Sequence, residues 1–327
     1  MPTATIKNFG LANLTQASLS FSVDGGAPVS VAWTGNLGTG LEDGPVVIGS
    51  HSFTYGTHVV KVWTSGPNGQ SDPNPWNDTM SLTVYVCDVF NGTYTIGPTG
   101  TGADYPTIVD ALNDLNSCGI SGPTTFSIYP GTYTGQVSIG QLPGASATNT
   151  VTFQSSTGVA SDVILTYAAT GTGDNYVIRL DGADYITIQN MTIKTATTGT
   201  YGYGIVLTNG AHYNIIVGNT IESVPGTTSS STAGIYSGST LDEYNVISGN
   251  TIRYGYYGIY MYGPSSASPE NGNIIDGNII TDWYYYGTYP YYQRNYVVNG
   301  NTFTNASNSG VVYPLMAYYC YDGSIIT

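Results

Sequence analysis

A motif that returns about every 27 residues limits what most of this chain can fold into. Five segments align, and four of them carry Gly-Asn between two short apolar strands. A unit of this size cannot bury its own apolar face, so its copies must stack and pair strand to strand, about 4.8 Å apart. The sequence therefore predicts a solenoid of parallel strands. The aligned segments are 188–193, 216–221, 247–252, 275–280 and 298–303.

Asparagines hold one position of this repeat. Asn219, Asn250, Asn278 and Asn301 fall at the same place in four units. Stacked asparagines can hydrogen-bond side chain to side chain along a stack of strands, so we expect a ladder at one corner of the solenoid. A second apolar strand recurs in each unit, and it is expected at 204–206, 234–236, 258–260 and 310–312.

Composition narrows the class of protein. Only 8% of the residues are charged, yet no apolar run approaches the roughly 18 residues of a membrane span. Helix formers such as Glu, Lys and Arg are scarce, which favours an all-β chain. The formal charge of −14 repels phosphate backbones and anionic lipid, so nucleic acid and membrane surfaces are unfavourable partners.

Residues 1–87 read as short alternating strands separated by Gly, Asn and Pro turns, the pattern of a small β-sandwich. The run 63–70 with the loop that follows resembles the bacterial CARDB-type adhesion modules, which implies an immunoglobulin-like fold for this first domain. Closely spaced oxygen side chains in the loop predict a calcium site, and the alternative is that they satisfy the backbone of a long turn. These side chains are Asp72, Asn74, Asn77 and Asp78.

Residues 88–327 open with a strand at 92–97 and an amphipathic helix at about 104–117, which Asp104 is expected to cap and Gly119 to end. Together with the strand at 126–133 they resemble the start of pectate-lyase-like proteins. That resemblance implies a right-handed parallel β-helix whose helix plugs the first coil. The expected fold class is all-β, an immunoglobulin-like sandwich followed by this β-helix with its capping helix.

Catalytic groups are sparse in the repeats. Lys194, Glu222 and Arg253 follow three successive repeat motifs and predict a stripe of ion pairs on the solvent face. A glycoside hydrolase needs converging carboxylates, and the stack does not supply them.

A looser acidic group stands where the coils begin. Asp174, Asp181 and Asp184 surround Arg179 in the sequence and are the best candidates for a lyase or hydrolase site. Since two of these aspartates adjoin glycine, the alternative is that they form turns.

Three cysteines are present. In a secreted protein, a bridge between Cys87 and Cys118 would fasten the capping helix to the strand that joins the domains. Cys320 would then be a small apolar residue that packs in the interior.

Thirty tyrosines crowd into clusters about one coil apart. They predict a tyrosine-rich wall, which serves either as stacking between coils or as a surface for a glycan or a protein partner. The named members are Tyr256, Tyr257, Tyr260, Tyr284, Tyr285, Tyr286, Tyr291 and Tyr292.

Taken together, the sandwich, the helix start and the repeats resemble pieces of large surface proteins secreted by the type IX pathway. That resemblance implies a non-catalytic extracellular or cell-surface protein, either an adhesin or a filament subunit, with no cofactor beyond the calcium. A polysaccharide-active lyase or hydrolase and a tyrosine-lined carbohydrate-binding protein are the alternatives. Since the chain stops in mid-repeat, we expect either a longer protein or a second subunit over the last coil.

Overall fold

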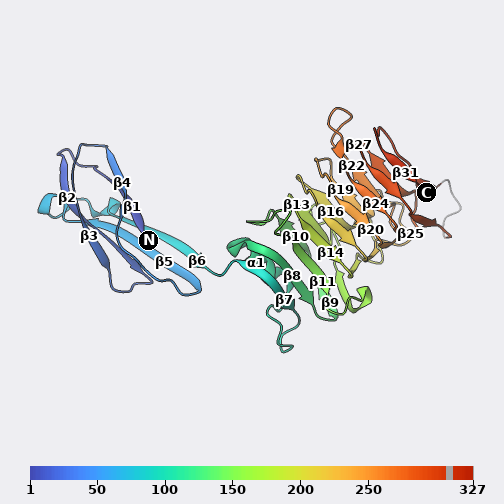
Figure 1. Ribbon diagram of the computed structural model, residues 1–327, viewed down its shortest axis with the longest axis horizontal. Coiled ribbons are helices and arrows are strands. Elements are labelled where there is room, and N and C mark those ends of the chain that lie inside the picture. The colour runs from blue at the N-terminus through green and yellow to red at the C-terminus, as the bar shows by residue number, and fades with distance from the viewer. Residues whose placement is uncertain (307–311, 327) are drawn as a thin grey trace. The chain divides into compact units, whose positions relative to one another are not determined.

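The computed structural model describes residues 1–306 and 312–326 (Figure 1). The chain divides into two compact units, Met1–Asp88 and Val89–Thr327. Each unit buries its own apolar cluster. The predicted fold class is confirmed, since nearly all elements are strands and the second unit is a parallel solenoid.

The first unit packs two antiparallel sheets against each other, as a sandwich does. Leu19 and Phe21 of the ten-residue strand 14–23 lie in the core at 1% exposure, and Trp33 of the next strand belongs to the same buried cluster. The larger sheet has the order β3-β2-β5-β6, and the smaller has only β1 and β4. The strands are β1 (Thr3–Lys7), β2 (Leu14–Val23), β3 (Val29–Leu37), β4 (Glu42–Val47), β5 (Gly56–Ser65) and β6 (Thr79–Val86).

The second unit winds through three parallel sheets, one strand of each per coil (Figure 1). The first sheet holds β7 (Phe90–Ile96), β8 (Ile120–Ile128), β11 (Val151–Ser155), β14 (Ile186–Gln189), β17 (Ile215–Val217), β20 (Val246–Ser248), β24 (Ile274–Asp276), β28 (Val297–Asn299) and β31 (Ser324–Ile326). The second holds β9 (Gly131–Thr134), β12 (Val163–Thr166), β15 (Thr192–Lys194), β18 (Thr220–Glu222), β21 (Thr251–Arg253), β25 (Ile279–Thr281) and β29 (Thr302–Thr304). The third holds β10 (Val137–Gly140), β13 (Ile178–Asp181), β16 (Gly202–Thr208), β19 (Thr232–Ser237), β22 (Tyr257–Tyr262), β26 (Tyr286–Tyr291) and β30 (Tyr313–Leu315). A short extra pair joins β23 (Glu270–Asn271) to β27 (Gln293–Arg294).

The repeat sets the register of the coils. Ile188, Ile216, Ile247 and Ile275 pair in sequence along the first sheet, and each is at most 2% exposed. Burying a side chain of this size stabilises the fold by about 1.5–3 kcal/mol relative to leaving it in water. The central residue of β17, β20 and β24 is buried in each case, so the apolar interior is continuous from coil to coil.

A column of glycines explains the Gly-Ile pattern of the third sheet. Gly204, Gly234, Gly258 and Gly287 lie one above another in β16, β19, β22 and β26, and a Cβ on any of them would meet the backbone of the next coil. The sequence reading missed Gly287. The last strand predicted for this sheet, at 310–312, lies largely outside the described residues. The strand that the structure shows nearby is β30.

The capping helix α1 (Ile108–Cys118) starts later than predicted. Asp104 does not cap it, because the Asp104 carboxylate accepts hydrogen bonds from the Thr95 amide and hydroxyl, both at 2.7 Å. Thr107 is the cap instead, since its hydroxyl accepts from the Asp110 amide. Gly119 ends the helix at a φ of 69°, which a glycine adopts without strain. Among the described residues, no helix is long and apolar enough to cross a membrane.

Two asparagine ladders, not one, bracket the first sheet. In the predicted ladder, Asn219 Nδ2 donates to Asn250 Oδ1 at 3.1 Å and to the Ile188 carbonyl at 2.8 Å. Asn250 and Asn278 continue the pattern, each donating to the next asparagine at 2.9 Å. A second ladder runs five residues earlier in each coil, and its members are Asn214, Asn245 and Asn273.

Candidate functional site

A surface of tyrosines covers the outside of the third sheet. In β22, Gly258 and Ile259 are both buried, so Tyr257, Tyr260 and Tyr262 point outward. Register pairs these three with the matching tyrosines of β26. We call the resulting surface the tyrosine face. It comprises Tyr203, Tyr236, Tyr257, Tyr260, Tyr262, Tyr286, Tyr289, Tyr291, Tyr313 and Tyr318.

The rings of the tyrosine face stack from coil to coil. Tyr257 lies 5.6 Å from Tyr286 with 6° between ring planes, and Tyr260 lies 5.1 Å from Tyr289 with 12° between them. Near-parallel rings at these centroid distances are offset, which leaves ring edges and part of each ring face toward solvent. Most of these side chains are accordingly half-buried.

The other predicted tyrosines lie along the margins of this face. Tyr256 contacts Tyr284 and Tyr285, each with ring centroids 5.5 Å apart. Tyr292 stacks on Tyr319 at 5.4 Å. All eight named tyrosines therefore make ring contacts. Tyr262 and Tyr289 belong to the sequence clusters that predicted the wall, whereas Tyr203 and Tyr236 lie outside those clusters and were not predicted.

The tyrosine face is uncharged. Strands β19, β22 and β26 contain no Asp, Glu, Lys, Arg or His. Burial raises the pKa of Tyr286 to about 12 and raises the pKa values of Tyr257 and Tyr260 further. The hydroxyls therefore stay protonated at physiological pH, and the face offers neutral hydrogen-bond donors and acceptors.

The aspartates of the predicted acidic group make separate hydrogen bonds and do not converge on one site. Asp174 accepts from the amides of Thr170 and Gly171, and these hydrogen bonds lower its pKa to about 2. Asp184 Oδ1 accepts from the His212 amide at 2.8 Å, which ties one coil to the next.

Asp181 and Arg179 form the remaining part of that group. Both point outward from β13, and Arg179 Nη2 lies 3.3 Å from Asp181 Oδ2. The pair belongs to the same sheet as the tyrosine face, three strands before β22.

The ion-pair stripe lies on the second sheet. Lys194 Nζ is 3.0 Å from Glu222, and Arg253 reaches Glu222 at 3.8 Å and Asp282 at 3.9 Å. Ion pairs this exposed stabilise a fold by about 0–1 kcal/mol.

A buried acidic cluster was not predicted from the sequence. Glu270 is fully buried; its Oε2 accepts from Gln293 at 2.6 Å and from Asn273 at 3.1 Å, and its Oε1 accepts from Ser237 at 2.6 Å. Burial raises the pKa of Glu270 to about 8, and burial also raises the pKa of nearby Asp242. Ser237 and Gln293 stand 33 and 23 residues from Glu270, so the sequence alone does not reveal the cluster.

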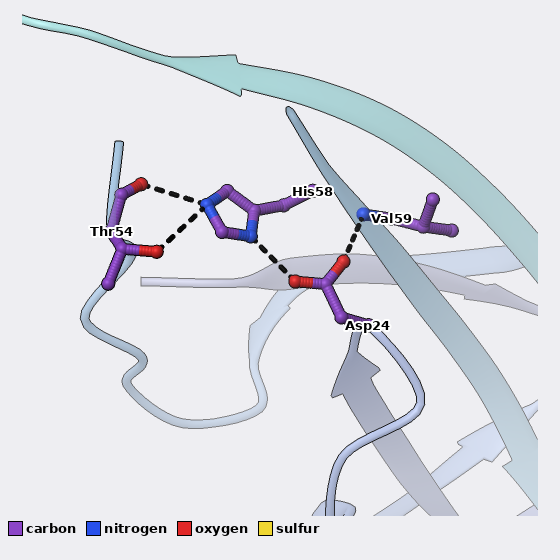
Figure 2. Close-up of polar contacts among 4 residues, drawn as sticks. All are labelled: Asp24, Thr54, His58 and Val59. Carbon is purple, nitrogen blue, oxygen red and sulfur yellow. Dashed lines mark hydrogen bonds and ion pairs between the residues drawn. The ribbon is translucent and has the colours of Figure 1, made fainter. Parts of the chain in front are cut away.

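In the first unit, His58 contacts Asp24 in one loop and Thr54 in another (Figure 2). Its Nδ1 lies 2.7 Å from Asp24 Oδ2, and its Nε2 lies 2.8 Å from the Thr54 carbonyl oxygen. Because both ring nitrogens face acceptors, the arrangement favours the doubly protonated imidazolium. The hydrogen bond to Asp24 accordingly raises the pKa of His58.

The loop of the predicted calcium site turns on itself. Asp72 Oδ1 accepts from the Asn74 amide at 2.7 Å, and Asp78 Oδ1 accepts from the Thr64 hydroxyl at 3.3 Å. Residues Pro75–Asn77 form a short 3-10 turn between them. Over residues 1–306 and 312–326, no three His, Cys, Asp or Glu side chains converge as a metal site would require. Calcium binding stays a prediction.

Cys320 was expected to pack in the interior as a small apolar residue, and the structure shows it half-buried. Its thiol is free, and its Sγ lies 3.2 Å from the Pro290 carbonyl oxygen. The bridge between Cys87 and Cys118 stays a prediction.

Comparison with known proteins bears on the fold. A family model described as the right handed beta helix region matches residues 176–314. A pectin methylesterase in complex with a hexasaccharide is 13% identical, with 66% of this chain and 67% of that chain covered and a TM-score of 0.48. The Escherichia coli protein ybhc is 11% identical, with 78% and 77% covered and a TM-score of 0.45. A rhamnogalacturonan lyase is 12% identical, with 72% and 62% covered and a TM-score of 0.38.

No curated protein matches the chain. The family match falls inside the second unit and covers most of its repeats, from the residues before β13 to β30. The three parallel sheets and this match agree: the second unit of the chain is a right-handed parallel β-helix.

Proposed function

We propose that this chain is a non-catalytic adhesive protein, working outside the cell, whose tyrosine face binds an uncharged glycan. The observation that carries the proposal is the face itself, with outward tyrosines in register on neighbouring coils of a rigid scaffold. A tyrosine combines an apolar ring with a hydroxyl that donates and accepts hydrogen bonds, so it can contact both the C–H surface and the hydroxyls of a sugar.

The charge of the chain favours a neutral ligand over an acidic one. The formal charge is −14, and the strands at the centre of the face carry no cation to offset it. An anionic polysaccharide would approach against this field, whereas a neutral glycan would not.

The acidic groups argue for binding rather than catalysis. A glycoside hydrolase needs two carboxyl groups about 5–9.5 Å apart that flank the scissile bond. The Asp174 carboxylate accepts hydrogen bonds from its own turn, and the Asp184 carboxylate accepts one from the next coil. Strands β19, β22 and β26 contain no carboxylate.

A polysaccharide-active enzyme is the second candidate, and one observation favours it. Asp181 and Arg179 project from β13 on the same sheet as the tyrosine face, so a glycan bound along that sheet would pass near them. In that case Arg179 would act as the base of a lyase or Asp181 as an acid of a hydrolase.

The resemblance of the first unit to adhesion modules, and of the whole to surface proteins secreted by the type IX pathway, supports the extracellular setting. A bridge between Cys87 and Cys118 would form under the oxidising conditions found there.

Affinity electrophoresis tests the proposal. The chain is run through gels that contain xylan, a neutral β-glucan or polygalacturonate as the anionic comparison. Retardation by a neutral polymer is expected, and replacing Tyr257 and Tyr286 together by alanine should weaken it at least about tenfold, a loss of 1.4 kcal/mol or more.

Tyr213→Ala is the matched control. Tyr213 stacks between Tyr185 and Tyr244 at 5.2 and 5.0 Å, but it precedes β17 and so belongs to the first sheet. Losing this ring should leave retardation unchanged. Equal retardation of the double variant and the original chain would refute the role of the tyrosine face.

A further inference from the structure

The sandwich of the first unit has an open apolar side. Its larger sheet has four strands and its smaller sheet two, so β6 faces no strand within residues 1–88, all of which are described. Met80 and Leu82 of β6 alternate with polar residues as core side chains do, yet they are 67% and 53% exposed. A sandwich normally buries this face of each sheet.

The open side is a groove with a volume of about 1060 Å³. Its floor is apolar and includes Val60, Val62 and Val84 beside the two exposed residues of β6. Every residue of β1 lines the groove, and no residue of β4 does. The groove therefore runs along the edge of β1 that does not pair with β4.

The free edge of β1 and the apolar floor together leave room for one further β-strand. The free edge of β1 offers unpaired backbone N–H and C=O groups, and such an edge is a template for pairing with another chain. The floor offers apolar contacts to every second side chain of an extended peptide. A small apolar ligand or a lipid tail could fill the floor but would leave the edge unpaired.

We infer that this groove binds an extended peptide strand from a partner protein, which pairs with β1 and inserts alternate apolar side chains between β1 and β6. The carboxylates of Asp72 and Asp78 lie on the rim of the groove and favour a peptide with a basic residue at one end. This mode of binding is strand addition to a sheet edge. It does not depend on the tyrosine face.

A second copy of this chain fits the groove less well. A second copy that paired through its own β1 would have only Ala4 and Ile6 as apolar side chains to insert into the groove. Both already pack into the core of that copy, where Ile6 is only 4% exposed. Its other β1 side chains are Thr3, Thr5 and Lys7, which cannot fill an apolar floor. The Lys7 ammonium is also already paired with Glu42 at 2.8 Å.

The test uses the full chain and a labelled peptide, Lys-Thr-Val-Thr-Val-Thr-Val-Thr-Lys. Fluorescence anisotropy should rise on titration, and the same peptide with proline in place of its central valine should bind at least about tenfold more weakly, because proline cannot donate to the ladder. Leu82→Asp should weaken binding by a similar factor. Because Leu82 is 53% exposed, the Leu82→Asp variant should fold as the original chain does.

Leu41→Asp is the matched control, since Leu41 is 59% exposed in the same unit but does not line the groove. It should bind the peptide as the original chain does. Absence of binding up to about 1 mM peptide, or binding that Leu82→Asp leaves intact, would overturn the inference. So would a dimer, seen by light scattering without peptide, that Leu82→Asp dissociates, because the occupant would then be a second copy.

Discussion

Glu270 shows how a single buried carboxyl group can couple the solenoid to pH. It is fully enclosed, and Ser237, Asn273 and Gln293 hydrogen-bond to it. Its pKa is raised by burial from 4.5 to about 8. The native state therefore holds a proton that the unfolded chain releases above about pH 4.5, so stability is highest at low pH and falls as pH rises toward 8.

Replacing Glu270 by glutamine should flatten this dependence, because the amide cannot ionise. The expected change in the free energy of unfolding between pH 5 and 8 is about 4 kcal/mol at most in the original chain, and much smaller in Glu270→Gln. Urea titrations at the two pH values measure it. Glu222→Gln removes a carboxylate from the ion-pair stripe and should keep the original dependence; an unchanged dependence in Glu270→Gln would show that other groups cause it.

At the scale of the strand, the glycine column fixes how close neighbouring coils approach. A Cβ on Gly258 would lie 2.6 Å from Ile280 Cγ2 and would also press on the Gly287 backbone. Because backbone cannot move aside as a flexible side chain can, Gly258→Ala should destabilise the solenoid by about 1–3 kcal/mol.

Thermal unfolding measures this cost. Gly173→Ala is the control, since nothing lies within 4 Å of a Cβ built there and its φ lies outside the left-handed region. The control should unfold near the original temperature. Equal unfolding temperatures for Gly258→Ala and Gly173→Ala would show that the coils can separate to admit a methyl group.

Sequence periodicity predicts elements well where each strand repeats the same inward residue. The stack from Ile188 to Ile275 and the asparagines from Asn219 to Asn278 were readable because a fixed spacing repeats. The start of α1 was not, because Asp104 and Thr107 both suit a helix cap and the choice depends on Thr95, nine residues before Asp104. Local sequence patterns cannot reveal which distant group will hydrogen-bond to a given side chain.

The whole molecule joins two units that each bury a separate core. The division was readable from composition and pattern, but the open side of the sandwich was not. Met80, Leu82 and Val84 alternate like any buried strand, and only the strand pairing reveals that two of them are exposed. The tyrosine face was readable as clusters, while its offset stacking required the register of β22 on β26.

The central claim is that the tyrosine face binds a neutral glycan and leaves it intact. The most direct measurement incubates the chain with a neutral oligosaccharide of defined length that it retains, and follows the length distribution by mass spectrometry. The account predicts saturable binding with no change in length. Shorter products that disappear in Asp181→Asn or Arg179→Ala would contradict it and would place an active site at β13, beside the face.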